Sequence, residues 1–143
     1  MPLQLKIKKL HPKAKIPHYP HAGDAAFDLY TTAAITIASR ERVQIPTGLA
    51  FEIGEGYVGL IWDKSGLSHK IGLKTLGGVI DAGYRGEVFV GMMNCGENSY
   101  TFEEGDKVAQ MIIQAREHAE FVEVNDLSDT SRGTGGFGST GHA

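Results

Sequence analysis

The stretch GLAFEIGEGYVGLIW (Gly48–Trp62) contains two short apolar runs separated by a turn. GLAFEI (48–53) and YVGLIW (57–62) are rich in aromatic and branched side chains, and the GEG triplet between them favours a turn. Long helical periodicity is hard to find anywhere in the chain. The stretch therefore predicts two β-strands, and it sets the pattern for the rest of the sequence.

Runs of the same kind continue on both sides of this stretch. We expect strands over residues 3–8, 27–31, 34–37, 42–46, 77–81, 87–94, 99–105 and 107–116, with a last strand over 119–124. The apolar run in Val108–Ala115 also fits a helix, and we prefer a strand because its neighbours are strands. At most one short helix is expected, over Gly66–Ile71 with Ser65 as its N-cap. Many short strands predict an all-β sandwich, jelly roll or barrel.

The bulk composition is that of one globular domain, with 143 residues, of which 41% are hydrophobic and 22% charged. A polar stretch over 125–132 leads into a glycine-rich end that has no apolar face to bury, so we expect this end to be mobile. We therefore divide the chain into a β-barrel body (1–125) and a flexible C-terminal arm (126–143).

The net charge of −3 argues against a nucleic-acid polymer as partner, whereas a few local cations and N–H groups are enough for a small anionic ligand. Cys95 is the only cysteine, so a disulfide within the chain and a cysteine-based metal site are both excluded. No apolar run has the length of a signal peptide or a membrane span. We expect a soluble cytoplasmic protein without membrane contacts, and a nuclear location stays open.

Two acidic residues, Asp24 and Asp28, lie four positions apart in AGDAAFDLY (Ala22–Tyr30). In a strand, this spacing places both carboxylates on one face. Two interpretations stay open: a carboxylate here holds a metal, directly or through water, or the pair caps turns.

The segment DKSGLSHKIGL (Asp63–Leu73) is a candidate for holding phosphate. Lys64, Ser65 and the N–H groups near Gly66 would form a cradle at a helix start, or they are an ordinary helix cap beside surface lysines. Gln110 lies in an otherwise apolar run, and a buried amide needs a partner. That partner is a ligand, a neighbouring subunit or the core.

A carboxylate also lies on a predicted hairpin turn in GGVIDAGYRGEV (Gly77–Val88). The paired glycines allow close approach by a planar ligand. Next to phosphates, Asp81 would orient a water and accept its proton, and Tyr84 would pack against a sugar. The alternative is a hairpin whose Asp and Gly serve only the turn.

The C-terminal stretch RGTGGFGSTG (Arg132–Gly141) combines a cation, glycines, hydroxyls and one aromatic ring. Arg132 has the planar fork that suits a terminal phosphate, and Phe137 is able to stack on a base. Further donors would come from Gly135, Gly136, Gly138, Ser139 and Thr140. This is not a Walker A loop, because no lysine follows the glycines. The alternative is a flexible, linker-like end.

Taken in order, these five segments resemble the five motifs of the homotrimeric dUTPase family, over residues 22–141. GVIDAGYRG (78–86) and RGTGGFGSTG (132–141) are the most specific of them. The resemblance implies a jelly-roll-like subunit, a homotrimer with active sites at subunit interfaces, and Mg²⁺-dependent hydrolysis of dUTP to dUMP and pyrophosphate. That reaction limits uracil in DNA and supplies dUMP for thymidylate synthesis.

The resemblance also implies roles for single residues. Asp81 would position the water that attacks the α-phosphorus, Tyr84 would pack under the deoxyribose, and Asp28 would hold Mg²⁺ through water. The backbone of Gly78, Val79 and Ile80 would contact uracil. Further substrate contacts would come from Lys64, Ser65, Gly66, Gln110, Arg132, Phe137, Gly138, Ser139 and Thr140. In the family, the C-terminal arm usually reaches a neighbouring subunit's site.

Three positions depart from the family pattern. The second motif usually reads Pro-Arg-Ser-Gly and the fourth usually contains Gly-Asp-Arg, whereas this chain has DKSG (63–66) and GDK (105–107). Lys64 and Lys107 keep the positive charge but lose the bidentate fork of arginine. Asp63, where proline is usual, has no explanation from the sequence.

Two alternatives to hydrolysis remain. The dCTP deaminases, including bifunctional ones, share the fold, but that family has a glutamate ten residues after the aspartate that matches Asp81, and this chain has Gly91 there. Its Arg-Ser-Ser motif is also absent. A non-catalytic module on the same scaffold would bind nucleotide without turnover.

Overall fold

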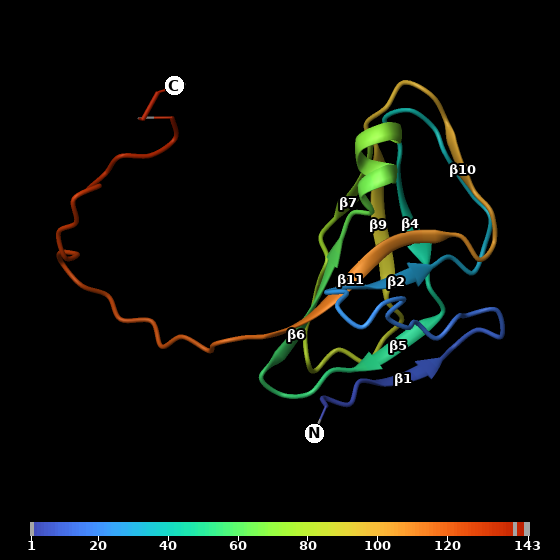
Figure 1. Ribbon diagram of the computed structural model, residues 1–143, viewed down its shortest axis with the longest axis horizontal. Helices are drawn as coiled ribbons and strands as arrows, with labels where there is room; N and C mark the ends of the chain where they lie inside the picture. Colours follow the sequence, from blue (N-terminus) through green and yellow to red (C-terminus); the bar gives the residue numbers. More distant parts are fainter. Residues whose placement is uncertain (1, 139, 142–143) are drawn as a thin grey trace.

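The computed structural model describes residues 2–138 and 140–141, and strands dominate it (Figure 1). The strands are β1 (Lys6–Lys9), β2 (Phe27–Tyr30), β3 (Ile35–Ile37), β4 (Arg42–Pro46), β5 (Leu49–Glu52), β6 (Tyr57–Trp62), β7 (Leu73–Leu76), β8 (Val79–Ile80), β9 (Phe89–Asn94), β10 (Tyr100–Phe102) and β11 (Lys107–Ala115). A short helix, η1 (Leu67–Ile71), joins β6 to β7. The predicted all-β class is confirmed, and the doubtful run 108–115 is a strand.

The largest sheet has the strand order β2–β11–β6–β8. Strand β11 runs antiparallel to both neighbours, so that Gln110 lies opposite Asp28 on one side and opposite Trp62 on the other. Side chains alternate between the two faces of a strand. Met111 and Ile61 therefore point into the core, whereas Gln110 and Trp62 lie on the outer face. This outer face carries the polar side chains of the candidate site.

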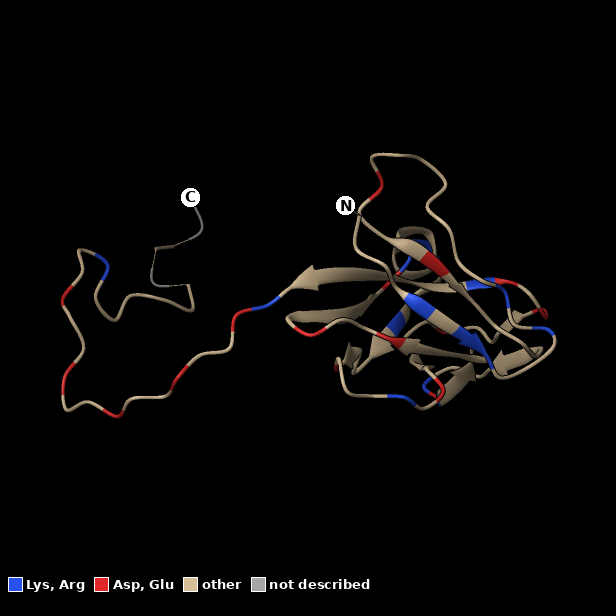
Figure 2. Ribbon diagram, turned by 90° about the horizontal axis from the view of Figure 1, so that it is seen from below, with Lys and Arg blue, Asp and Glu red and all other residues tan. Residues whose placement is uncertain are grey.

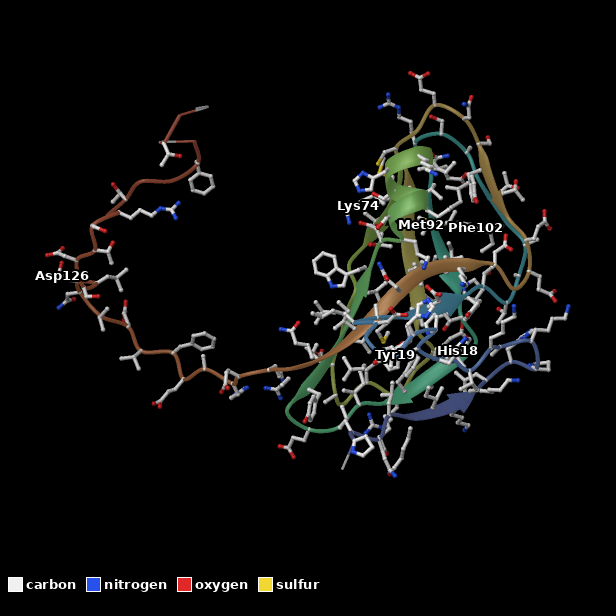
Figure 3. The ribbon with its side chains drawn as sticks, viewed as in Figure 1. His18, Tyr19, Lys74, Met92, Phe102 and Asp126 are labelled. Atoms are coloured by element: carbon white, nitrogen blue, oxygen red, sulfur yellow. The ribbon has the colours of Figure 1, made fainter. Side chains whose placement is uncertain are left out.

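Three smaller sheets pack around the same core in a jelly-roll-like arrangement, with the orders β4–β9–β7, β1–β5 and β10–β3. Along β9, Val90, Met92 and Asn94 are buried, and they alternate with more exposed residues, as expected for a half-buried strand. Figure 3 shows Met92 and Phe102 within the body. The largest fully buried side chains are Phe51, Phe102, Leu29, Ile37, Ile45, Leu49, Leu73, Met92 and Met111.

Some local predictions are wrong. Residues 119–124 form no strand, and Phe121 is 95% exposed. Alternating apolar residues would place their side chains on one face, but a strand also needs a neighbouring strand edge to pair with. Gly66, not Ser65, occupies the N-cap position of η1, and no described side chain caps this helix. Strand β1 begins at Lys6 instead of residue 3, because only residues 6–9 pair with β5.

Beyond β11, the chain leaves the body and extends away from it (Figure 1). We call residues 117–131 the connector, and from here on the name arm is restricted to the glycine-rich residues 132–138 and 140–141. The connector contains acidic residues at regular intervals (Figure 2), and Figure 3 shows Asp126 on it, far from the body. In the part of the chain that the structure describes, no helix has the length and hydrophobicity of a membrane span.

Candidate functional site

The four-stranded sheet brings three of the predicted site segments to its outer face. Asp28 lies on β2 and Gln110 lies directly opposite it on β11. Strand β6 ends beside Gln110, at Trp62, and continues into Asp63 and Lys64. Antiparallel register, which the sequence does not display, thus places residues from three distant segments next to one another.

These residues line an open cavity of about 610 Å³, the phosphate-side cavity. Four predicted residues contribute to it, namely Asp28, Lys64, Ser65 and Gln110. Asp24, the other candidate carboxylate, also lines it. The sequence assigned no site role to the remaining lining residues, which are Pro20, Ala25, Ala26, Trp62, Asp63, Ser68, His69 and Ile112. Asp24 and Asp28 do not share a strand face, because Asp24 lies in the turn before β2. There its carboxylate accepts the His21 N–H, as the turn-capping interpretation expects for this residue.

Asp28 is the electrostatic centre of this cavity. It is 6% exposed, and its Oδ1 and Oδ2 lie 2.5 Å from Lys64 Nζ and 3.3 Å from Lys107 Nζ. Burial raises the pKa of the Asp28 carboxyl, but hydrogen bonds and attraction from the two lysines outweigh it and hold the pKa below its ordinary value. The two lysines that replace the family's arginines therefore meet on one carboxylate.

Asp63, which the sequence left unexplained, joins three strands. Its Oδ1 accepts the Thr75 N–H at 2.6 Å and its Oδ2 pairs with Lys74 Nζ at 2.7 Å, so it ties the end of β6 to β7. Its backbone carbonyl accepts Gln110 Nε2 at 2.7 Å, which supplies the partner that this amide requires. Burial raises the pKa of Asp63, and the bonds from Lys74 and Thr75 lower it further than burial raises it.

A second hollow, of about 260 Å³, lies at the turn that follows β8, and we call it the hairpin pocket after the predicted hairpin. The prediction of a hairpin is itself wrong, because β8 pairs with β6 whereas β9 pairs with β4 and β7 of another sheet. Its lining includes the predicted residues Val79, Ile80, Asp81 and Tyr84. The Tyr84 hydroxyl donates to the Glu87 carbonyl at 2.8 Å, and the Tyr84 N–H donates to the Asp81 carbonyl at 3.1 Å. These bonds hold Asp81 and the tyrosine ring together on an exposed turn. The sequence did not assign Glu87, Val88 and Phe89, which also line the pocket.

Gly78 explains how the backbone reaches this position. Its φ is +107°, and an added Cβ would lie 2.9 Å from the Ile61 carbonyl oxygen, so a side chain does not fit. Its own carbonyl accepts the Ile61 N–H at 2.8 Å, which fastens the start of β8 to β6. The close backbone approach seen at Gly78 is to strand β6, and the approach of a planar ligand to the paired glycines stays a prediction.

Within one chain, the predicted site falls into three separate groups. The phosphate-side cavity and the hairpin pocket share none of their described lining residues. The arm lies away from both (Figure 1), with Arg132 Nε donating to the Gly135 carbonyl at 2.6 Å and the Phe137 ring fully exposed. Gly138 and Thr140 lie on the same arm, and Ser139 is outside the described residues. Gly66 lies beside Ser65 but does not line the cavity.

The acidic groups of the phosphate-side cavity limit how a divalent metal could be held there. In residues 2–138 and 140–141, no three His, Cys, Asp or Glu side chains are grouped as a metal site. Mg²⁺, however, is commonly held by one or two carboxylates together with substrate phosphates and water. Asp28 therefore fits a metal that arrives with a polyphosphate, and it does not fit a metal held by protein ligands alone.

The fold and the two cavities define a jelly-roll-like protein with a polar cavity, lined by Lys64 and Ser65 beside three aspartates, and a separate hairpin pocket. The dUTPase family model matches residues 12–141, and the chain belongs to the dUTPase family. The family resemblance drawn from the five motifs is thereby confirmed.

Curated relatives carry the name deoxyuridine 5'-triphosphate nucleotidohydrolase. The relative from Nautilia profundicola is 45% identical over 141 residues, which cover 97% of this chain and 99% of that protein. The relative from Thermobifida fusca is 42% identical over 142 residues, covering 97% and 79%.

Solved structures agree with this assignment. The Staphylococcus bacteriophage 80alpha dUTPase with dUPNHPP has a TM-score of 0.91 at 30% identity, over 97% of this chain and 99% of that one. A mutant dUTPase from phage phi11 of S. aureus, described with a structural Mg(II) ion, has a TM-score of 0.81 at 28% identity, over 87% and 98%.

Proposed function

We propose that this protein hydrolyses dUTP to dUMP and pyrophosphate, using Mg²⁺. The observation that carries the proposal is the hairpin pocket, in which Asp81 and Tyr84 are held together beside the backbone of Val79 and Ile80. Family membership and the relatives named as dUTP-hydrolysing enzymes support the same reaction.

The hairpin pocket suits the nucleoside half of the substrate. The backbone of Gly78, Val79 and Ile80 would read the uracil edge, and the Tyr84 ring would pack under the deoxyribose, leaving no room for a 2′-hydroxyl. Because Tyr84 is fixed through its hydroxyl to Glu87, the ring is held in position before the substrate arrives.

The phosphate-side cavity suits the triphosphate. Lys64 and Ser65 line it, and Lys107 reaches its central carboxylate, Asp28. Gln110 would act mainly by fixing the Asp63–Ser65 loop, since its amide nitrogen already donates to Asp63. Arg132 would bind the γ-phosphate, Phe137 would cover the uracil, and Gly138, Ser139 and Thr140 would add phosphate contacts.

In the reaction, Asp81 would accept a hydrogen bond from a water and direct it at the α-phosphorus. The water oxygen bonds to phosphorus as the bond to the bridging oxygen of pyrophosphate breaks, and Asp81 takes the proton. Mg²⁺, held through water by Asp28, would neutralise charge on the phosphate oxygens. Positioning and charge neutralisation carry most of such a reaction, so it needs no covalent step on the protein.

We further propose that the active unit is a homotrimer whose sites lie between subunits. Two observations support this. The phosphate-side cavity and the hairpin pocket are separate in one chain, so a neighbouring subunit would complete each site. In addition, large apolar side chains are open to solvent on the sheet and connector, with Trp62 52%, Val79 66% and Leu127 86% exposed.

Deamination of dCTP is disfavoured by the place of Gly91. This residue lies within β9, opposite Leu76 of β7, and an added Cβ would meet the Leu76 carbonyl oxygen at 3.0 Å. A glutamate side chain at this position, as in the deaminases, would therefore be crowded by the backbone of β7.

The deciding experiment is incubation of the purified protein with dUTP and Mg²⁺, with dCTP, dTTP and UTP alongside. We expect pyrophosphate and dUMP from dUTP, little turnover of the other nucleotides, and no ammonia from dCTP. A protein that binds dUTP without releasing pyrophosphate would be a binding module and would refute the proposal. Sustained ammonia release would indicate a deaminase.

A further inference from the structure

An ion-pair cluster lies at the phosphate-side cavity, and we call it the Lys-Asp-Lys cluster. Asp28 and Lys64 line the cavity, and Lys107 does not line it but pairs with Asp28. Each carboxylate oxygen of Asp28 faces a different lysine, Oδ1 at 2.5 Å from Lys64 Nζ and Oδ2 at 3.3 Å from Lys107 Nζ. The side chain of Asp28 is 8% exposed, whereas those of Lys64 and Lys107 are 30% and 52% exposed. The carboxylate is therefore fixed in the wall, and the lysine side chains lie closer to solvent.

In this arrangement Asp28 neutralises the ammonium groups of Lys64 and Lys107. A triphosphate that enters the cavity must compete with Asp28 for both ammonium groups. Lysine suits such an exchange, because its ammonium is a compact charge on a flexible four-carbon stem, whereas the planar fork of arginine is committed to one bidentate geometry. The exchange also changes Asp28, whose two oxygens lose their partners as the lysines turn to phosphate.

We propose that Asp28 is an internal counter-ion that holds Lys64 and Lys107 until a triphosphate displaces it, and that its release makes it ready for Mg²⁺. This inference rests on the proposed function for the identity of the ligand. Asp28 thereby opposes triphosphate binding when no metal is present and favours it when Mg²⁺ is present. Binding of the nucleotide and binding of the metal become mutually dependent through one carboxylate.

The test uses one variant, Asp28→Asn, and calorimetric titration with the dUTP analogue dUpNHpp. The change in affinity relative to the wild type should have opposite signs without and with Mg²⁺. In EDTA, the variant should bind dUpNHpp about tenfold more tightly than the wild type, because a competing charge-assisted pair has been removed. With Mg²⁺ present, the same variant should bind it at least about tenfold more weakly, because the carboxylate that orients the metal's water is lost.

The matched control is Asp24→Asn. Asp24 lines the same cavity and carries the same charge, but in the described part of the chain its carboxylate accepts the His21 N–H and is paired with no lysine. Removing this charge should change dUpNHpp affinity in EDTA by less than about twofold, which is the size of a screened, exposed charge effect. If both variants tighten equally, the effect is general electrostatics and the proposal is wrong.

Two further measurements protect the test. If Asp28→Asn fails to fold, as shown by its melting curve, the ¹⁵N ammonium signals of Lys64 and Lys107 in the wild type decide: they should shift on adding dUpNHpp in EDTA, and unchanged signals would overturn the proposal. Inorganic tripolyphosphate replaces dUpNHpp as a second probe, since it needs no uracil pocket. If the wild type does not hydrolyse dUTP but Asp28→Asn still binds tripolyphosphate more tightly than the wild type, the exchange of lysine partners is supported and the proposed function is rejected. Unchanged or weaker metal-free binding by Asp28→Asn would overturn the exchange itself.

Discussion

At the scale of single residues, the two predicted site carboxylates have opposite surroundings. Asp28 is 6% exposed and its pKa is lowered by two lysines, so it is held in the charged form in the cavity wall. Asp81 is exposed at a turn, and in the described residues no lysine or arginine is paired with it. A carboxylate without a fixed cationic partner is available to a water and its proton, which is the role we propose for Asp81.

Asp81→Asn should reduce the rate of dUTP hydrolysis by about 10²- to 10⁴-fold, the usual contribution of a positioned general base. Binding of dUpNHpp should stay within a few-fold of the wild type, because the amide keeps the size of the carboxyl group. The measurements are single-turnover pyrophosphate release and calorimetric titration. Asp126→Asn, on the connector, is the control and should behave as wild type; a normal rate for Asp81→Asn would remove Asp81 from the mechanism.

Gly78→Ala should destabilise the protein by about 1–2 kcal/mol or more, the cost of a positive φ for a residue with a Cβ. The new methyl group would also meet the Ile61 carbonyl oxygen at 2.9 Å. Gly83→Ala is the matched control, since an added Cβ there meets nothing within 4 Å. Urea unfolding at one subunit concentration measures both; equal stability of the two variants would contradict the strained geometry of Gly78.

At the scale of elements, the loop between β6 and η1 is held from several sides. Asp63 binds β7, Gln110 of β11 donates to the Asp63 carbonyl, and Lys64 pairs with Asp28 of β2. The Lys64 carbonyl also accepts the Ser68 N–H of η1. An aspartate at position 63 therefore restrains this loop through side-chain bonds, where the family's usual proline would restrain it through the backbone. This restraint is local to the chain and does not require a ligand.

Asp63→Ala should lower the free energy of unfolding by about 1.5–3 kcal/mol, the range for hydrogen bonds to a charged group. It should also raise the KM for dUTP more than it lowers kcat, because the loop that bears Lys64 and Ser65 loses its anchor. The Asp63 carboxylate has two partners, Lys74 Nζ and the Thr75 N–H. Lys74→Met removes only the first and should have a smaller effect of the same kind. Denaturation and steady-state rates test this, and an unchanged KM would show that Asp63 stabilises β7 alone.

The pH dependence of stability follows from the same group. The pKa of Asp63 is lowered in the folded protein relative to its ordinary value of 3.8, so the unfolded chain binds its proton first as the pH falls. The stabilisation is fully present above about pH 4–5 and is lost as the pH falls through the folded pKa. Asp63→Ala should therefore show a shallower loss of stability below about pH 4 than the wild type. Parallel acid titrations of the two proteins would contradict this.

At the scale of the whole molecule, the arm and connector make no strand with their own body in the part of the chain that the structure describes. Connector side chains such as Phe121 and Leu127 are 95% and 86% exposed, a cost that a protein in water ordinarily removes by contact with another surface. The arm has Arg132 and Phe137 but, among its described residues, no buried anchor of its own. Both features agree with an arm that closes over a site completed by a neighbouring subunit.

Deletion of residues 132–143 should reduce kcat/KM for dUTP by at least about 10²-fold, because a phosphate-binding arginine and the cover of the site are lost together. The body should remain folded, since the buried core lies entirely within residues 14–111, and it should keep the mass of the proposed trimer. Light scattering after size exclusion measures the mass. Phe137→Ala alone should show a milder loss, whereas normal rates in the deletion variant would show that the arm is only a linker.

The sequence by itself was enough for the all-β class, for the turn that carries Asp81 and Tyr84, and for the five segments that indicate the family, but the hairpin expected around that turn is absent because β8 and β9 belong to different sheets. These features depend on local properties: side-chain alternation, turn residues and short motifs. It also predicted that Gln110 needs a partner, without naming Asp63 as that partner.

Only the tertiary structure decided which of these residues meet. Asp28 contacts Lys64 and Lys107, which come from segments far along the chain, because antiparallel register sets β2 beside β11 and β11 beside β6. Asp63 finds its side-chain partners on β7, a strand of a different sheet, so the packing of two sheets decided its role. Residues 119–124 form no strand, because they find no partner edge among the described residues of their own chain. Propensity is local, but pairing across strands is a property of the whole sheet, and the chemistry of this site depends on that pairing.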